Sequence, residues 1–195
     1  FYYMGGDNFY GLTLIEYIWI GGNNELRSKT KVISKMINTI HEIPDWNFDG
    51  SSTGQTTGTH SEIIIKPQRM YNNPFDETSK IVLCDTYWPD GTPHPTNTRH
   101  NANKLFTDGH HLHPWFGLEQ EFFISRKTCG GSLVPVAFPN NQSVPEPQGD
   151  YYCGVGGSNI YGRDYVHEIL QKALSAGLHL TGMNAAVAPA QWEFQ

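Results

Sequence analysis

The chain has 195 residues, of which 38% are hydrophobic and 16% are charged, and its formal net charge is −6. This composition can supply a hydrophobic core, but it contains no apolar run long enough to cross a membrane. It also lacks the clustered Lys and Arg that a nucleic-acid partner requires. Three cysteines without metal-ligand or disulfide spacing favour a reducing, cytoplasmic location.

The first half of the chain predicts a small mixed sheet. Residues 12–20 are rich in β-formers, and the Gly and Asn residues at 21–24 are typical of a hairpin turn. Apolar residues then recur at helical spacing and predict a short helix before Pro44: Val32, Ile33, Met36, Ile37 and Ile40. After a Gly/Ser/Thr loop at 49–58, the pattern predicts two strands and a short helix, at 62–67, 80–87 and 96–106.

The second half predicts fewer elements. A His-rich segment at 107–114 is typical of a linker, and 118–122 (LEQEF) predicts a strand. A long Pro/Gly/Asn-rich loop follows at 128–149. The clearest helix has Asp164 as its predicted N-cap and Gly177 as its C-terminal stop. The segments 178–182 and 191–195 predict two further strands.

Three acids stand in apolar, aromatic strand patterns. Glu119 and Glu121 are two residues apart, so a strand would place both carboxylates on one face, roughly 7 Å apart. Glu193, between Trp192 and Phe194, repeats the pattern. Because buried like charges repel, this arrangement predicts a divalent cation held by hard oxygen ligands. The alternative interpretation is that these are surface acids on edge strands.

Other polar residues permit both a functional and a structural interpretation. The run from Asp49 to Ser52 forms turns readily, and Tyr152 can serve as a packing aromatic. Three histidines at 110, 111 and 113 suit a metal less well than a solvated linker. The GVGGSN segment lacks the third Gly of the dinucleotide fingerprint, and no Gly loop continues into a P-loop.

Seven blocks cover nearly all residues from 16 to 195: EYIWIGG…LRSKT, IPDWNFDGSSTGQ, IVLCDTY…DGTPHPTNTRH, HPWFGLEQEF, PQGDYYCGVG, YGRDYVHE and NAAVAPAQWEFQ. Together and in this order, they resemble glutamine synthetase of the eukaryotic type. The resemblance implies an α+β fold, with a β-grasp domain at 1–106, a linker at 107–114 and the first part of a catalytic domain at 115–195. It also implies ATP-dependent ligation of ammonia to glutamate through a γ-glutamyl phosphate, in a homo-oligomer of two stacked pentameric rings (a decamer).

The resemblance further implies roles for individual residues. Glu119 would bind the ATP-side Mg²⁺ or Mn²⁺, while Glu121 and Glu193 would bind the glutamate-side ion. Residues 193–195, including Phe194 and Gln195, would border the nucleotide. Asp49 and Ser52 match a loop that reaches a neighbouring subunit's site, where Asp49 would bind ammonium and take its proton. Tyr152 would line the same ammonium pocket.

The sequence departs from the family at specific positions. Ala186 stands where the family has a third Glu ligand for the glutamate-side ion, and Asp150 stands where it usually has Pro. The family's metal-binding His and its Arg groups for ATP and glutamate would follow Gln195, so we expect a fragment or processed product that is inactive alone. Two alternatives remain open: an inactive subunit kept for assembly, and a ligase for another amine.

Overall fold

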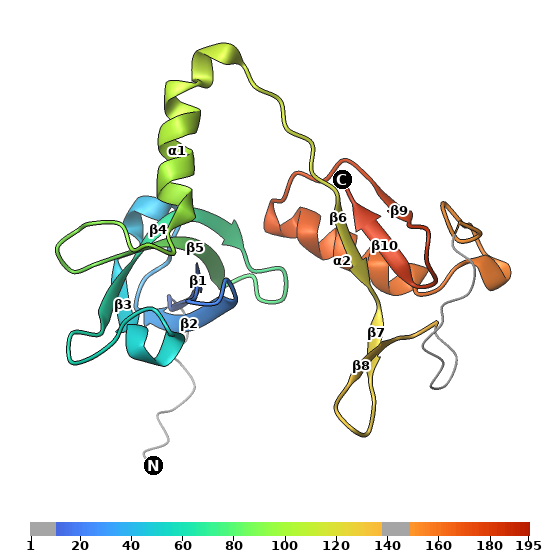
Figure 1. Cartoon of the computed structure of the whole chain (residues 1–195), viewed down its shortest axis with the longest axis horizontal. Helices are drawn as coiled ribbons and strands as arrows, with labels where there is room; N and C mark the ends of the chain where they lie inside the picture. Colours follow the sequence, from blue (N-terminus) through green and yellow to red (C-terminus); the bar gives the residue numbers. More distant parts are fainter. Residues whose placement is uncertain (1–10, 138–148) are drawn as a thin grey trace. The chain divides into compact units, whose positions relative to one another are not determined.

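A computed structural model describes residues 11–137 and 149–195, in an α+β fold that confirms the predicted class. The chain forms two compact units that divide between Pro114 and Trp115, at the end of the predicted linker. Within the described residues, no helix combines the length and the apolar character needed to cross a membrane. Figure 1 shows the elements in chain order.

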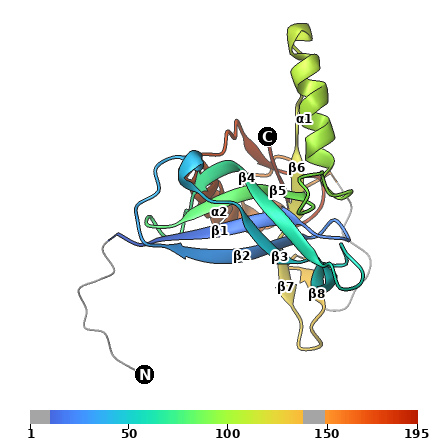
Figure 2. The same cartoon turned by 90° about the vertical axis from the view of Figure 1, so that its left-hand side faces the viewer.

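The first unit is built on a five-stranded sheet with the order β2-β1-β5-β4-β3. Strand β1 pairs antiparallel with β2 and parallel with β5, and the remaining pairs are antiparallel. Figure 2 shows these strands in a second view, turned by 90° from Figure 1. The strands are β1 (Thr13–Ile20), β2 (Leu26–Ile33), β3 (Trp46–Asp49), β4 (Glu62–Asn72) and β5 (Lys80–Tyr87).

The core of this unit lies on one face of the sheet. Alternate residues of β1 point into it, and Tyr17 donates its hydroxyl to the Pro44 carbonyl at 2.9 Å. The buried set is Ile15, Tyr17, Trp19, Ile37, Ile43, Ile65 and Val82. Strands 12–20 and 80–87 are thus confirmed, and the strand predicted at 62–67 runs on to Asn72.

The helix predicted across residues 32–40 is wrong. Val32 and Ile33 end strand β2, opposite Leu14 and Thr13 of β1, and only the short 3₁₀ turn η1 (Ile40–Glu42) is helical. Pairing with β1 decides the outcome, because β-branched side chains pack well on a pleated sheet while helical spacing is only a local preference.

A helix follows the sheet, as predicted for 96–106. Helix α1 (Thr98–Asp108) starts after Asn97, whose side chain accepts from the His100 amide at 3.1 Å. It projects from the sheet of its own unit and has no buried residue (Figures 1 and 2). A 3₁₀ turn, η3 (His110–Leu112), lies in the predicted linker and leaves the three histidines exposed.

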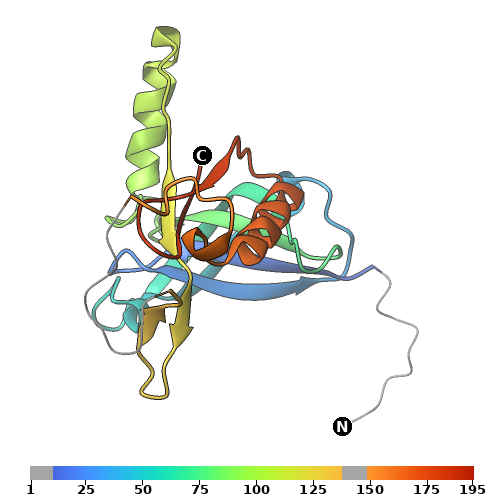
Figure 3. The same ribbon diagram turned by 90° about the vertical axis from the view of Figure 1, so that its right-hand side faces the viewer.

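The second unit contains a three-stranded antiparallel sheet of order β6-β10-β9, covered on one face by helix α2 (Figure 3). Its core contains Val166 of the helix together with Ala185, Trp192 and Phe194 of the sheet. A two-stranded hairpin and a 3₁₀ turn complete the unit. The elements are β6 (Gln120–Phe123), β7 (Ser125–Lys127), β8 (Leu133–Pro135), η4 (Gly157–Asn159), α2 (Arg163–Ala176), β9 (Met183–Ala185) and β10 (Gln191–Phe194).

The boundaries of this unit correct two predictions. Helix α2 has Gly162, not Asp164, as its N-cap; Asp164 lies in the first turn, where its charge suits the helix dipole. Gly177 caps the C-terminus in the left-handed conformation, as predicted. The strand predicted at 178–182 is absent, because the chain pairs with β10 only from Met183 onward. The predicted loop at 128–149 includes β8, and its part at 138–148 lies outside the described residues.

Candidate functional site

The loop after β3 presents one exposed carboxylate. Asp49 ends β3 and caps the short 3₁₀ turn η2 (Gly50–Thr53). Its side chain accepts from the Ser51 amide at 2.9 Å, the Ser51 hydroxyl at 2.6 Å and the Ser52 hydroxyl at 3.4 Å. The hydrogen bond from the Ser51 hydroxyl, followed by that from Ser61, holds the pKa of Asp49 below its ordinary value. The group therefore stays ionised, which favours binding a cation and weakens it as a proton acceptor.

An open hollow of about 470 Å³ lies beside this loop, and Asp49 and Ser52 contribute to its wall. Two cationic side chains also line it, and each has a partner. Arg27 bonds to Glu25 at 2.5 Å, while Lys29 donates to the Asn47 carbonyl at 2.9 Å. Both cations already interact with oxygen atoms of the chain, so the hollow is not a simple anion site.

In the second unit, two of the predicted acids lie directly opposite each other. Glu121 of β6 and Glu193 of β10 are register partners in the antiparallel pair. Because Trp192 and Phe194 point into the core under α2, Glu193 lies on the other face of the sheet. Opposite residues on neighbouring antiparallel strands have Cβ atoms about 5 Å apart, so the two acidic side chains start close together on the same face.

Each of these acids has an amide donor on a neighbouring residue. Glu193 is 8% exposed and accepts from Asn184 Nδ2 at 2.6 Å, across the β9–β10 pair. Glu121 is exposed and accepts from Gln191 Nε2 at 2.7 Å. These bonds orient the carboxylates while leaving further oxygen lone pairs available.

The charges of Glu193 and Glu119 act on the phenol of Tyr152. Its loop is joined to the end of β9, where the Cys153 amide donates to the Ala185 carbonyl at 3.0 Å. The charge and hydrogen bond of Cys153 raise the pKa of Tyr152, and the charges of Glu193 and then Glu119 raise it further. The structure therefore brings Tyr152, Glu119 and Glu193 into one electrostatic neighbourhood.

The predicted set of three metal-binding acids is not assembled as one group. Glu119 is exposed and precedes β6, because the strand begins at Gln120 and not at residue 118. Within 11–137 and 149–195, no group of three His, Cys, Asp or Glu is placed to hold one ion. The Glu121–Glu193 pair still fits Mg²⁺, which is commonly bound by one or two carboxylates and completed by water and phosphate oxygens. The role of Glu119 stays a prediction.

Of the other residues discussed above, Phe194 and Gln195 directly follow Glu193, and Ala186 directly follows β9. Phe194 points into the core, with its ring centroid 5.2 Å from that of Phe122. Gln195 is exposed and donates through Nε2 to Asn184 Oδ1 at 3.0 Å. Ala186 is 4% exposed, and its amide donates to the Gln191 carbonyl at 2.9 Å. Its methyl group cannot bind a metal, as the sequence predicted.

Sequence reasoning missed Asn184 and Gln191. Both are single polar residues within apolar stretches. Asn184 is the register partner of Glu193, and Gln191 lies two residues before Glu193, so both share its face of the sheet. This shared face was visible in QWEF, where Gln191 and Glu193 alternate with aromatic residues. For Asn184 the signal was weaker, because the strand around it was predicted too early in the chain.

Comparisons with known proteins match the chain to glutamine synthetases. Residues 11–89 match the family model for the β-grasp domain of glutamine synthetase. The chain is 44% identical over 186 residues to glutamine synthetase cytosolic isozyme 2 of Vitis vinifera, which covers 93% of this chain and 51% of that protein. It is 46% identical over 189 residues to a putative glutamine synthetase of Acanthamoeba polyphaga mimivirus, with 94% and 52% covered. A nodule isozyme of Lupinus luteus is 45% identical over 186 residues, with 93% and 52% covered. The chain spans about half the length of the curated relatives it matches.

Proposed function

Because this chain belongs to the glutamine synthetase family along the half of the family's length that it spans, we propose that it supplies part of the site of an ATP-dependent glutamate–ammonia ligase. The observation that carries the proposal is the pairing of Glu121 and Glu193 in register on one sheet face, with Asn184 and Gln191 orienting them. Two adjacent carboxylates form a site for a hard divalent cation.

In this proposal, Glu121 and Glu193 hold Mg²⁺ or Mn²⁺, and Glu119 contributes on the ATP side. A bound divalent ion supplies charge neutralisation for phosphoryl transfer from ATP to the glutamate carboxylate. The carboxylates of the chain fix the position of that charge, while residues 193–195 border the nucleotide. The burial of Glu193 supports this role, because charge–charge interactions are stronger where water is excluded.

Asp49 and Ser52 serve the ammonia step. An ionised, exposed Asp49 is suited to attract ammonium. In the proposal, Tyr152 of a neighbouring copy supplies a phenol to the ammonium pocket that Asp49 enters. Accepting a proton from ammonium would be easier if Asp49 lost part of its stabilisation by the serine hydroxyls, since those bonds lower its basicity. We propose that this loop acts in the site of a neighbouring copy, within a homo-oligomer of two five-membered rings.

The proposed location is the cytoplasm, supported by relatives that are named as cytosolic isozymes. Three small molecules would be the substrates: ATP, glutamate and ammonia. The second candidate function is that of an inactive subunit retained for assembly. Ala186 favours it, since a methyl group replaces a metal ligand expected from the resemblance.

The test compares the 195-residue chain with the longest product of its gene. Each is supplied with Mg²⁺ or Mn²⁺, ATP, glutamate and ¹⁵N-ammonium, and labelled glutamine is measured together with phosphate release. We expect turnover by the longer product, none by the 195-residue chain alone, and a loss of at least about 100-fold in Glu121→Gln of the longer product. Glu168→Gln, an exposed acid on α2, is the matched control. A longer product that makes no glutamine would favour the assembly subunit.

A further inference from the structure

Behind the exposed Asp49 loop lies a set of buried polar side chains that the proposed chemistry does not use. Thr53, Gln55 and His94 are 6%, 7% and 4% exposed. A buried polar group that lacks a partner is costly, so such residues persist where their hydrogen bonds are satisfied. Here the partners come from three separate parts of the first unit.

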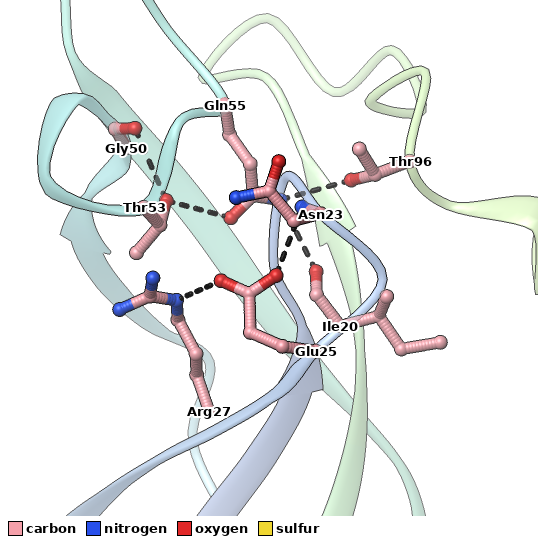
Figure 4. Close-up of polar contacts among 8 residues, drawn as sticks. All are labelled: Ile20, Asn23, Glu25, Arg27, Gly50, Thr53, Gln55 and Thr96. Atoms are coloured by element: carbon pink, nitrogen blue, oxygen red, sulfur yellow. Dashed lines mark hydrogen bonds and ion pairs between the residues drawn. The ribbon is translucent and has the colours of Figure 1, made fainter.

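Gln55 is the centre of this set, and Figure 4 shows its side-chain contacts with Ile20, Thr53 and Thr96. Its Nε2 donates to the Ile20 carbonyl at 3.2 Å and to Thr96 Oγ1 at 2.9 Å. Its Oε1 accepts from the Thr53 hydroxyl at 2.8 Å, and that hydroxyl is also 3.1 Å from the Gly50 carbonyl. One side-chain amide therefore links the end of β1, the segment before α1 and the η2 turn.

The His94 side chain forms a hydrogen bond with the backbone of Gln55. Its Nε2 is 2.8 Å from the Gln55 carbonyl, which can only accept, so Nε2 carries the proton. Its Nδ1 then accepts from the Thr96 amide at 3.2 Å and lies 2.8 Å from Thr96 Oγ1. The Thr96 hydroxyl completes the set by accepting from Gln55 and donating to His94.

The β1–β2 hairpin closes the other side of the loop. The Gly22 amide donates to the Thr53 carbonyl at 3.0 Å. A Cβ at Gly22 would lie 2.6 Å from the Gly54 carbonyl oxygen, so only glycine permits this approach. The Gly50 carbonyl accepts from the backbone amide of Gln55 at 2.9 Å. Gly50, which directly follows Asp49, is thereby fixed from behind.

We propose that Gln55 and His94 are positioning residues that set the orientation of the Asp49–Ser52 loop. The proposal rests on the proposed function, which places Asp49 and Ser52 at the ammonium pocket. Neither Gln55 nor His94 contacts Asp49. They act through Gly50, Thr53 and Thr96, so their loss should disturb the hydrogen bonds of the carboxylate before it disturbs the sheet.

The test substitutes Gln55→Glu in the isotopically labelled 195-residue chain. This change keeps the size of the side chain, but it places an oxygen where Nε2 donates to two acceptors. By NMR we would measure the titration of the Asp49 carboxyl carbon and the hydrogen exchange of the Ser51 amide, which donates to that carboxylate. We expect the Asp49 pKa to move up toward its ordinary value and exchange at Ser51 to accelerate at least about tenfold, while amides in the β1–β5 pair keep their protection.

Two further variants keep the result interpretable. Thr96→Val removes the hydroxyl shared by Gln55 and His94 without changing side-chain shape, and should reproduce the effect if Gln55→Glu does not fold. Thr56→Val is the control, because the Thr56 hydroxyl is buried with no hydrogen-bond partner in the described part of the chain. Wild-type titration and exchange in both Gln55→Glu and Thr96→Val would overturn the proposal. So would a uniform loss of protection across the sheet. Neither NMR readout requires turnover. The chain can therefore fail to make glutamine and still show the expected changes at Asp49 and Ser51, so failure of the proposed function and failure of this proposal are distinguishable.

Discussion

The Glu193→Gln substitution tests the paired carboxylates most directly. Without metal, two effects oppose each other. Relief of the repulsion with Glu121 stabilises the protein by about 0.2–1 kcal/mol, the usual range for directly opposite cross-strand charges. The hydrogen bond from Asn184 changes from charge-assisted to neutral, which costs about 1 kcal/mol. We therefore expect an apo melting temperature within about 6 °C of wild type.

With metal the two proteins should differ clearly. A ligand at 100 times its dissociation constant stabilises the folded state by about 2.7 kcal/mol, which corresponds to a rise of at least about 10 °C for a small domain. Wild type should show this rise in saturating Mn²⁺. Glu193→Gln should show less than half of it, because a neutral amide oxygen binds a hard cation more weakly than a carboxylate.

The assay is calorimetric or circular-dichroism melting in EDTA and across a Mn²⁺ series. Glu168→Gln on α2 removes one acid away from the pair and should retain the full metal response. The reasoning is refuted if the wild-type chain gains no stability from millimolar Mn²⁺. It is equally refuted if Glu193→Gln responds as strongly as wild type.

Three further predictions concern the fold. Tyr17→Phe removes the hydroxyl that donates to the carbonyl of the exposed Pro44 and should lower the unfolding free energy by about 0.5–1.5 kcal/mol in urea melts. Because burial raises the pKa of Tyr17 to about 12, its stabilising contribution is complete below pH 10 and is lost as the pH rises toward 12; the Phe variant should lack this part of the alkaline decline, and an unchanged decline would contradict the assignment. Burial also raises the pKa of the Cys84 thiol to about 12, so a thiol reagent at pH 8 should label Cys129 and Cys153 quickly and Cys84 only after unfolding; rapid labelling of all three in the native state would disagree. Gly22→Ala should destabilise the chain by about 1–3 kcal/mol in the same melts, and a neutral result would mean that the hairpin can move away from the η2 turn.

The local sequence pattern says more about which side chains share a face of a strand than about which strands pair with each other. In the structure Trp192 and Phe194 point into the core and Glu193 lies on the other face, which is the alternation that a strand at 191–195 requires. Nothing in the local pattern could show that Glu193 pairs with Glu121, because the two strands are far apart in sequence and register depends on the whole sheet. The strand predicted at 118–122 begins only at Gln120, so Glu119 lies before the strand and not within it.

The polar network was not predictable for a different reason. His94 and Gln55 each stand alone among turn residues, where a single polar side chain is usually solvated. Their burial arises from the meeting of three loops that tertiary structure alone brings together. The wrong helix at 32–40 has the same origin. Five positions fit a helical period, but the neighbouring β1 offered Val32 and Ile33 a better set of contacts.

The position of β1 between β2 and β5 has a consequence for how the chain is made. Its hairpin partner β2 emerges from the ribosome almost at once, whereas its parallel partner β5 is completed only at Tyr87. Until then, one edge of β1 has no strand beside it, and the apolar side chains of the nascent segment lack most of their cover. The sheet should therefore form cooperatively and late during synthesis, and translation arrested before residue 80 should yield a protease-sensitive hairpin instead of a stable partial domain.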